Sequence, residues 1–181
     1  MKLMFASDIH GSGYYCRKMV EAWKKEEAGR LILLGDILYH GPRNDLPKDY
    51  APKEVIAQLN AVKNEICAVR GNCEAEVDQM VLDFPVMADY CIIIEGKRTI
   101  YATHGHLYNE EHLPPLKEGD VLIHGHTHVL CAEQRETYTL LNPGSVSIPK
   151  EGNPPTYGIL DKDIFQIKDF EGNIIKEIKI L

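Results

Sequence analysis

Three short segments of the chain bring aspartate and histidine together at spacings that suit metal binding. They are residues 8–10 (Asp-Ile-His), 35–36 (Gly-Asp) and 124–128 (His-Gly-His-Thr-His). Two further candidate ligands, Asn72 and His104, lie between them in the sequence. Oxygen and imidazole ligands together suit divalent transition-metal ions, and a pair of such ions suits the hydrolysis of phosphoesters. The segments therefore predict a two-metal site.

In two of these segments the candidate ligands stand two residues apart. Side chains at positions i and i+2 of extended backbone point to the same side, so Asp8 and His10 are expected to face one ion, and the same spacing is expected to bring His126 and His128 to one end of the sheet. Gly125 would allow a close backbone approach beside the second pair. Each candidate taken alone also fits a polar residue that ends a strand or caps a turn. Five strand ends that each present a ligand type are much harder to explain by coincidence.

The expected secondary structure places these residues at strand ends. Short apolar segments predict strands at residues 3–7, 31–34 and 66–69. Helical spacing predicts a first helix over residues 13–28, with Ser12 as its N-cap and Gly29 at its C-terminal end. A second helix is expected to begin at Pro52. This β-α-β-α-β order predicts a parallel sheet with right-handed crossovers. Active sites of such sheets lie at the carboxyl ends of the strands.

The second half of the chain is richer in expected strands. A turn at residues 95–98 predicts a hairpin. Further strands are expected over 121–123, 129–134, 138–141, 157–161, 164–168 and 174–180. We therefore expect a single domain over residues 1–181 of the α/β class, in which two mixed β-sheets pack as a sandwich flanked by helices. His124 is interpreted as a strand-end residue rather than as a further ligand.

Composition narrows the class of protein. The chain has 181 residues, of which 44% are hydrophobic and 26% charged, as in a globular domain with its own core. Its net charge of −7 disfavours non-specific binding to nucleic acid. An odd number of cysteines, five, without a C-x-x-C pair favours a reducing cytoplasm. No apolar stretch reaches the ~18 residues that a membrane span needs, so we expect neither a span nor a signal peptide.

The order of the motifs resembles that of the calcineurin-like metallophosphoesterases, whose set is D-x-H, G-D, G-N-x-[DE], H-G and G-H-x-H. More closely, the chain is similar to the small bacterial phosphodiesterases of the YfcE type, in residues 38–44, 70–74 and 142–150 as well as in the core motifs. The resemblance covers nearly the whole chain. It implies the four-layer fold of that family, in agreement with the expected strands, and a metal-dependent phosphodiesterase activity.

The resemblance also implies which residue binds which ion. One ion would be held by Asp8, His10 and His128, and the other by Asn72, His104 and His126, with Asp36 shared between the two. Two such ions can share a bridging hydroxide, because metal binding lowers the pKa of water to ~7. This hydroxide would attack the phosphorus of a small phosphodiester in line. We expect Mn²⁺, although the same ligands also accept Zn²⁺, Fe²⁺, Co²⁺ or Ni²⁺.

One position departs from the family pattern. Many members have a histidine after the motif asparagine, where it resembles a proton donor to the leaving oxygen, whereas this chain has Cys73. A neutral thiol is a poor donor. We therefore expect a preference for leaving groups that need little protonation, such as aryloxides, with His106 as the candidate replacement acid. In the alternative interpretation Cys73 is a small buried residue without a chemical role.

Three other residues carry smaller expectations. Arg43 and Asn44 follow Asp36 in a polar loop and are candidates for contact with the substrate phosphate, the alternative being a solvated loop. Ser145 is interpreted as a turn residue rather than a nucleophile, because no base is evident beside it.

Two other functions fit a fold of this kind. The first is a non-catalytic protein-interaction scaffold resembling a retromer subunit, but here every ligand type is present. The second is a nuclease or a protein phosphatase, against which the acidic net charge and the short chain count. An exposed strand edge in the second half would also permit assembly into a dimer or tetramer.

Overall fold

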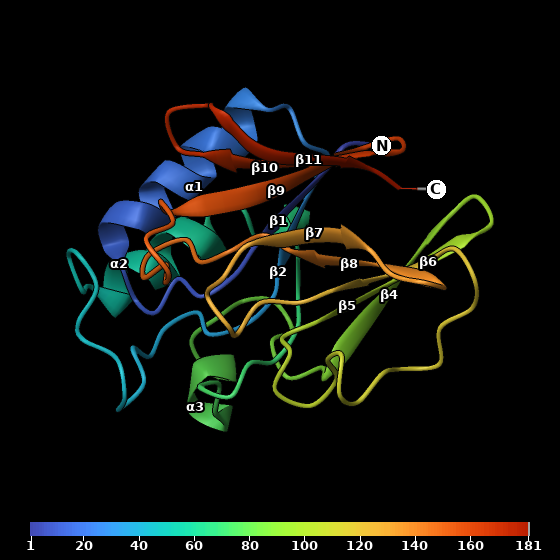
Figure 1. The fold of residues 1–181 in the computed structure, drawn as a ribbon. Coiled ribbons are helices and arrows are strands. Elements are labelled where there is room, and N and C mark those ends of the chain that lie inside the picture. Colours follow the sequence, from blue (N-terminus) through green and yellow to red (C-terminus); the bar gives the residue numbers. More distant parts are fainter. Residues whose placement is uncertain (181) are drawn as a thin grey trace.

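The computed structural model describes residues 1–180 and contains two β-sheets that pack face to face (Figure 1). The six-stranded sheet has the order β11-β10-β9-β1-β2-β3. Its strands are β1 (Leu3–Ala6), β2 (Arg30–Leu33), β3 (Ile66–Ala68), β9 (Thr156–Asp161), β10 (Ile164–Asp169) and β11 (Ile174–Lys179). The strands β1, β2 and β3 run parallel to one another, while β9 is antiparallel to β1.

The five-stranded sheet is also mixed and has the order β4-β5-β6-β8-β7. Its strands are β4 (Tyr90–Glu95), β5 (Arg98–Thr103), β6 (Asp120–Ile123), β7 (Cys131–Gln134) and β8 (Tyr138–Asn142). Here β5, β6 and β8 are parallel, and β4 and β7 are antiparallel to their neighbours. The expected fold class, two mixed sheets packed as a sandwich, is confirmed.

The helices lie mainly against one sheet. Helices α1 (Gly13–Lys25) and α2 (Pro52–Asn60) cover the outer face of the six-stranded sheet (Figure 1). A short 3-10 helix (Lys63–Glu65) precedes β3, and a short α3 (Glu76–Gln79) follows it. On the outer face of the other sheet, within residues 1–180, the buried Leu122 and Leu140 pack against Leu116 of a loop rather than against a long helix.

Alternation along β1 explains how the layers are held together. Met4 and Ala6 belong to the cluster that the sheet forms with α1 and α2, whereas Leu3 and Phe5 belong to the cluster between the two sheets. Successive side chains of a strand point to opposite faces, so a strand that is buried on both faces must be apolar throughout. The central position of β1 therefore fixes the loop that follows it, which carries the first candidate ligands.

Helix α1 is shorter than the sequence predicts. Its amino end is as expected, because the Ser12 side chain accepts a hydrogen bond from the Tyr15 backbone N–H at 3.2 Å. The helix ends at Lys25 instead of Ala28, and Glu27, not Gly29, takes the left-handed conformation with a φ of 53°. The Glu26 carbonyl is bound by the Lys2 ammonium at 2.8 Å, so a tertiary contact stabilises the earlier end. None of the described helices is long and apolar enough to cross a membrane.

Candidate metal centre

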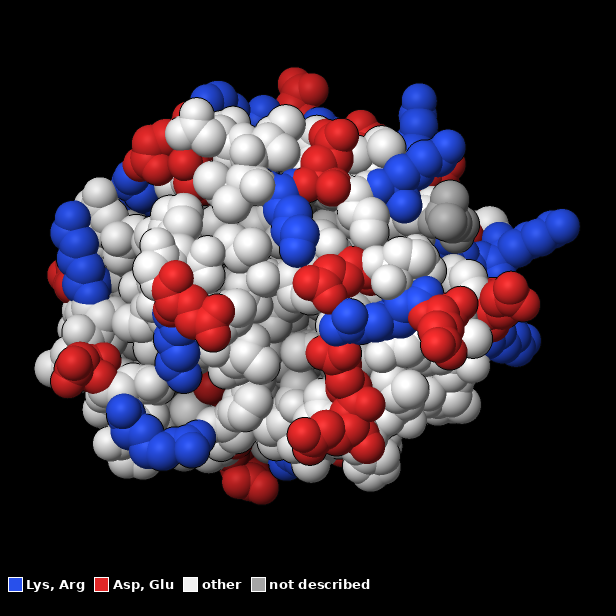
Figure 2. All heavy atoms as spheres, in the orientation of Figure 1, with Lys and Arg blue, Asp and Glu red and all other residues white. Residues whose placement is uncertain are grey.

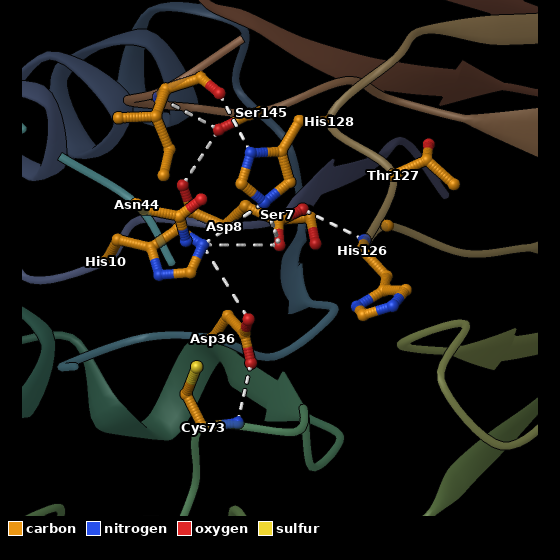
Figure 3. A network of polar contacts seen from close by, with 12 residues as sticks. Ser7, Asp8, His10, Asp36, Asn44, Cys73, His126, Thr127, His128 and Ser145 are labelled. Atoms are coloured by element: carbon orange, nitrogen blue, oxygen red, sulfur yellow. Dashed lines mark hydrogen bonds and ion pairs between the residues drawn. The ribbon is translucent and has the colours of Figure 1, made fainter. Parts of the chain in front are cut away.

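The predicted ligands converge where the loops after β1, β2, β3, β5 and β6 meet. Three groups of side chains have ligand atoms within 4.8 Å of one another. They are Asp8 with His10 and His128, Asp36 with His104 and His126, and His10 with Asp36 and Cys73. Figure 3 shows Asp36 and the group around Asp8 pointing toward one another from different segments of the chain. Both sheets contribute, because the carboxyl ends of their parallel strands open toward the same region.

Asp36 belongs to the second group and also lies close to His10 of the first. Its Oδ2 lies 3.6 Å from Nε2 of His10, and its Oδ1 lies 3.5 Å from Nε2 of His104. The two oxygens of one carboxylate thus face the two groups separately. This is the geometry that a ligand shared by two cations needs.

Backbone carbonyls fix the tautomers of three histidines. Each accepts a hydrogen bond from Nδ1: Tyr39 from His10 at 2.8 Å, Ile148 from His128 at 2.8 Å, and Leu34 from His104 at 2.6 Å. A neutral imidazole has one N–H and one lone pair, so in these three rings the lone pair is on Nε2. Hydrogen bonds of this kind orient histidines that bind metals.

The Nε2 atoms then face other acceptors rather than donors. Nε2 of His10 lies 3.2 Å from Nε2 of His128, and Nε2 of His104 lies 3.1 Å from Oδ1 of Asn72. Lone pairs that converge at such distances repel unless a cation lies among them. The arrangement therefore fits bound metal ions.

Asp8 supports the same interpretation. The residue is buried, and its Oδ1 lies 3.2 Å from Nε2 of His128 without a hydrogen-bond donor among residues 1–180. A buried carboxylate oxygen without a donor is suited to a cation. Burial, with a smaller contribution from His104, lowers the pKa of His126 to about 4, which keeps that ring neutral at neutral pH.

The backbone of the ligand loops differs from the extended conformation that we expected. Five predicted ligands have positive φ angles: Asp8 (59°), His10 (49°), Asp36 (55°), His126 (66°) and His128 (61°). The i, i+2 argument from extended backbone is therefore wrong in its premise. Asp8 and His10 still fall in one group of ligand atoms, whereas His126 and His128 fall in different groups. A left-handed backbone conformation at a residue other than glycine costs of order 1 kcal/mol of stability, and such conformations are enriched at functional sites.

Hydrogen bonds from residues outside the ligand set hold these loops. The buried Glu74 carboxylate accepts bonds from the backbone N–H groups of Asp36 (2.9 Å), Ile37 (2.7 Å) and Gly71. Burial, and next the charge of Asp36, raise the pKa of Glu74, which those bonds partly oppose. In the sequence, Glu74 was recognised only as part of the motif at residues 70–74, and no role was predicted for it.

A second support lies under Asp8. The hydroxyls of Ser145 and Ser147 both donate to the Asp8 carbonyl at 3.0 Å, and Ser145 Oγ accepts from the Ile148 N–H at 3.0 Å. Ser145 is thus a turn residue, as predicted, that also fixes the first ligand loop. Gly125 makes the close approach that we expected, because a Cβ there would overlap the Ser7 hydroxyl.

Cys73 lies at the centre and His106 beside it. The Cys73 N–H donates to Asp36 Oδ1 at 2.9 Å (Figure 3). Its thiol accepts from Asn72 Nδ2 at 3.3 Å. Burial and the Asp36 carboxylate raise the pKa of Cys73, so the thiol is neutral. The ring of His106 packs 5.3 Å from that of His104, and burial lowers its pKa.

A hollow of about 400 Å³ opens onto the centre. Its lining residues are Asp36, Arg43, Asn44, Asn72, His126, Thr127, His128 and Lys150. The structure therefore brings both predicted substrate contacts, Arg43 and Asn44, to the same hollow as four predicted ligands. His106 is not among the lining residues, and Lys150 is an addition that sequence reasoning did not single out.

A two-sheet sandwich with carboxylate and imidazole groups gathered at its strand ends defines a phosphoesterase of the metal-dependent class. Residues 1–163 match the family model of the calcineurin-like phosphoesterase superfamily domain, and the chain belongs to this superfamily. It is 52% identical over 167 residues to phosphodiesterase YfcE of Escherichia coli K12, which covers 92% of this chain and 91% of that protein.

Solved structures agree with the sequence comparison. The structure of Yfce, a phosphoesterase from E. coli, has a TM-score of 0.98 and 49% identity and covers both chains fully. Vps29 from Chaetomium thermophilum has a TM-score of 0.64 at 15% identity, covering 98% of this chain and 96% of that one. At this low identity, the similarity to Vps29 shows a shared fold alone.

Proposed function

We propose that this chain is a metal-dependent phosphodiesterase that hydrolyses a small phosphodiester at a dinuclear centre. The observation that carries the proposal is the position of Asp36, whose two oxygens face two separate groups of ligand atoms. Superfamily membership and 52% identity to a named phosphodiesterase over 92% of the chain make the enzyme class a phosphoric diester hydrolase.

The proposed ligands fall into two sets that share one residue. Asp8, His10 and His128 would hold one ion, Asn72, His104 and His126 the other, and Asp36 both. When bound, two divalent ions supply an ionised water molecule near neutral pH and neutralise charge on the phosphate. Mn²⁺ is our first choice for a set of oxygen and imidazole ligands, and Zn²⁺, Fe²⁺, Co²⁺ and Ni²⁺ suit it as well.

The chain's own groups orient the ligands and the substrate. The three carbonyls that accept from Nδ1 keep the Nε2 lone pairs of His10, His104 and His128 available to a cation. Glu74 holds the backbone of Asp36 in place. Arg43 and Asn44 line the hollow and would contact the phosphate of the bound diester.

A direct test measures metal content and turnover together. The purified protein should contain or bind Mn²⁺ and hydrolyse a generic aryl phosphodiester, and a chelator should abolish turnover. Asp36→Asn should lower kcat/KM more than about 100-fold, because both ions would lose the ligand that they share. At ~1.4 kcal/mol for each tenfold change, this is a loss of more than about 2.8 kcal/mol of transition-state stabilisation. Asp45→Asn, at an exposed position of the same loop, should leave activity unchanged. A protein that binds no metal and shows no turnover would overturn the assignment.

The leaving-group preference depends on Cys73. Its neutral thiol lies next to the proposed ligand Asn72, where a proton donor would act on the leaving oxygen, and His106 is the other candidate for that role. Cys73→His should raise kcat on alkyl diesters by about 10²-fold or more, since general-acid help is typically worth that much. Aryl diesters, whose leaving groups need little protonation, should change much less. Equal rates before and after the substitution on both substrates would remove the idea.

The rival functions are less well supported. A non-catalytic scaffold of the same fold needs no ligands, whereas here the ligand atoms converge with their lone pairs free of donors. On the face that Figure 2 draws, basic and acidic side chains are interspersed without a continuous basic stripe, which does not favour a nucleic-acid substrate. All five cysteines are free, and we infer a reducing cytoplasm as the location.

A further inference from the structure

Two cations of the hollow have no anionic partner in the protein. Within residues 1–180, neither the Arg43 guanidinium nor the Lys150 ammonium lies within ion-pair distance of a carboxylate. Arg43 differs in this from Arg17, Arg30 and Arg70, each of which pairs with one. The only acid among the described lining residues is Asp36, and its carboxylate faces the metal ligands. In a chain of net charge −7, two unpaired cations at one hollow indicate an anionic ligand.

The backbone fixes both cations at the site. The Lys150 N–H donates to the carbonyl of His128 at 3.1 Å, and the Lys150 carbonyl accepts from the N–H and side-chain amide of Asn153 at 3.1 and 2.9 Å. Arg43 lies in a loop closed by the Asn44 side chain, which donates to the His40 carbonyl at 2.8 Å. The charged ends are exposed, but they start from anchored positions beside the proposed metal ligands.

The charge of a simple diester does not account for these cations. A phosphodiester carries one negative charge, and two divalent ions bound by Asp8 and Asp36 already present a surplus of positive charge to it. The hollow also lacks a stacking surface, since its described lining contains no Phe, Tyr or Trp. Its other lining groups, Asn44 and Thr127, are polar and short, and they lie to either side of His128 in Figure 3.

We propose that the substrate is a small, non-aromatic phosphodiester whose alcohol arm carries a second anionic group, and that Lys150 together with Arg43 binds this group. The second group is a phosphate or a carboxylate, because these are the anions that guanidinium and ammonium groups recognise. Lys150 is thus a specificity-determining residue. The inference rests on the proposed phosphodiesterase function and names the substrate class of the same site.

The test uses two matched aryl diesters and the full-length protein with Mn²⁺. One is the p-nitrophenyl 2-methoxyethyl phosphodiester, and the other carries a phosphoryl group in place of the methyl group of the ether, so that neither ester has a free hydroxyl that could attack its own phosphorus. Release of p-nitrophenolate reports cleavage of the same bond in both. The wild-type kcat/KM should be about tenfold to a hundredfold higher for the ester with two phosphates. Lys150→Gln and Arg43→Gln should each remove most of that preference.

A matched control removes a positive charge elsewhere. Lys162 lies in the turn after β9, whose Leu160 pairs with Leu3 at the amino end of β1, so this turn is at the opposite end of the sheet from Asp8. Lys162→Gln should leave the preference unchanged. Equal kcat/KM for the two wild-type substrates, or an equal loss on both substrates in Lys150→Gln, would overturn the inference.

Binding separates this inference from the proposed function. Calorimetric titration with the two phosphonate analogues, in which a methylene group replaces the leaving oxygen, needs no turnover. Tighter binding of the analogue with two anionic groups, lost in Lys150→Gln, supports the inference even if neither ester is hydrolysed. Hydrolysis of both esters with equal binding of both analogues would leave the phosphodiesterase standing and refute the role of Lys150.

Discussion

At the scale of single residues, the candidate centre depends on backbone conformations that its ligands would not adopt alone. Asp8, His10 and Asp36 all have positive φ angles, and inter-loop hydrogen bonds hold them there. The Asp8 N–H donates to the Gly35 carbonyl at 3.1 Å, and the His10 N–H donates to the Asp36 carbonyl at 2.9 Å. The first two ligand loops therefore fix each other, and the carboxylate of Glu74 fixes the second to the third.

Glu74 is the residue where this support can be tested. Glu74→Gln keeps the size of the side chain but replaces one acceptor oxygen by an NH₂ group, which faces backbone N–H donors. We expect the free energy of unfolding to fall by about 1–3 kcal/mol and the Mn²⁺ affinity to fall about 10- to 100-fold. Chemical denaturation and metal titration measure the two effects. Glu54→Gln, at an exposed surface pair with Arg17, should change stability by less than about 0.5 kcal/mol and leave Mn²⁺ affinity intact. Unchanged metal affinity in Glu74→Gln would contradict the role.

At the scale of elements, the strands along the chain and the parallel arrangement of the first three could be predicted, whereas the conformations of the connecting loops could not. The apolar runs of β1, β2 and β6 are local signals, and the parallel-sheet rule then brings residues at their carboxyl ends together. The left-handed turns depend on partners far away in the sequence, such as Ser145 under Asp8, 137 residues apart. The early end of α1 likewise depends on Lys2. Lys150 gave no local signal, because its place in the hollow results from its bond to His128.

The hairpin of β10 and β11 offers a test that is independent of the metal centre. Burial alone would raise the pKa of Asp169, but bonds from the Asn173 side chain and from the backbone N–H groups of Asn173 and Glu171 outweigh it and lower the pKa. A carboxyl with a depressed folded pKa contributes stability above its unfolded pKa and loses that contribution as the pH falls through the folded value.

Asp169→Asn should therefore destabilise the protein by about 1 kcal/mol at pH 7. The difference from wild type should shrink as the pH falls below about 4, the ordinary aspartate pKa, because the wild-type carboxylate is then protonated as well. Urea denaturation across this range measures it. The exposed Asp161→Asn should show a difference below about 0.5 kcal/mol at every pH. A difference for Asp169→Asn that stays constant down to pH 2 would show that charge is not the cause.

At the scale of the whole molecule, the proposed centre requires both sheets. The loops after β1, β2 and β3 supply Asp8 with His10, Asp36 and Asn72, respectively. The loops after β5 and β6 supply the other three histidines, His104, His126 and His128. The apolar cluster between the sheets, which includes Phe5 and Val121, holds the two halves in register. The edge of the five-stranded sheet is different, because β4 is the last strand of its sheet and exposes Tyr90, Ile92 and Ile94 to 48%, 46% and 67%.

A long apolar edge strand is a surface on which a second copy can pair, so we expect the chain to form a dimer or a larger assembly through β4. Ile92→Lys places a charge in the middle of this strip and should raise the dissociation constant about tenfold or more, because a charge buried at an interface without a partner is costly. Light scattering after size exclusion, over a range of concentrations, measures the mass. Ile175→Lys, at an exposed position of β11, an edge strand of the six-stranded sheet, is the matched control and should leave the assembly intact. A wild-type protein that is monomeric at every concentration, or an assembly that Ile175→Lys disrupts and Ile92→Lys does not, would show that β4 is not the contact.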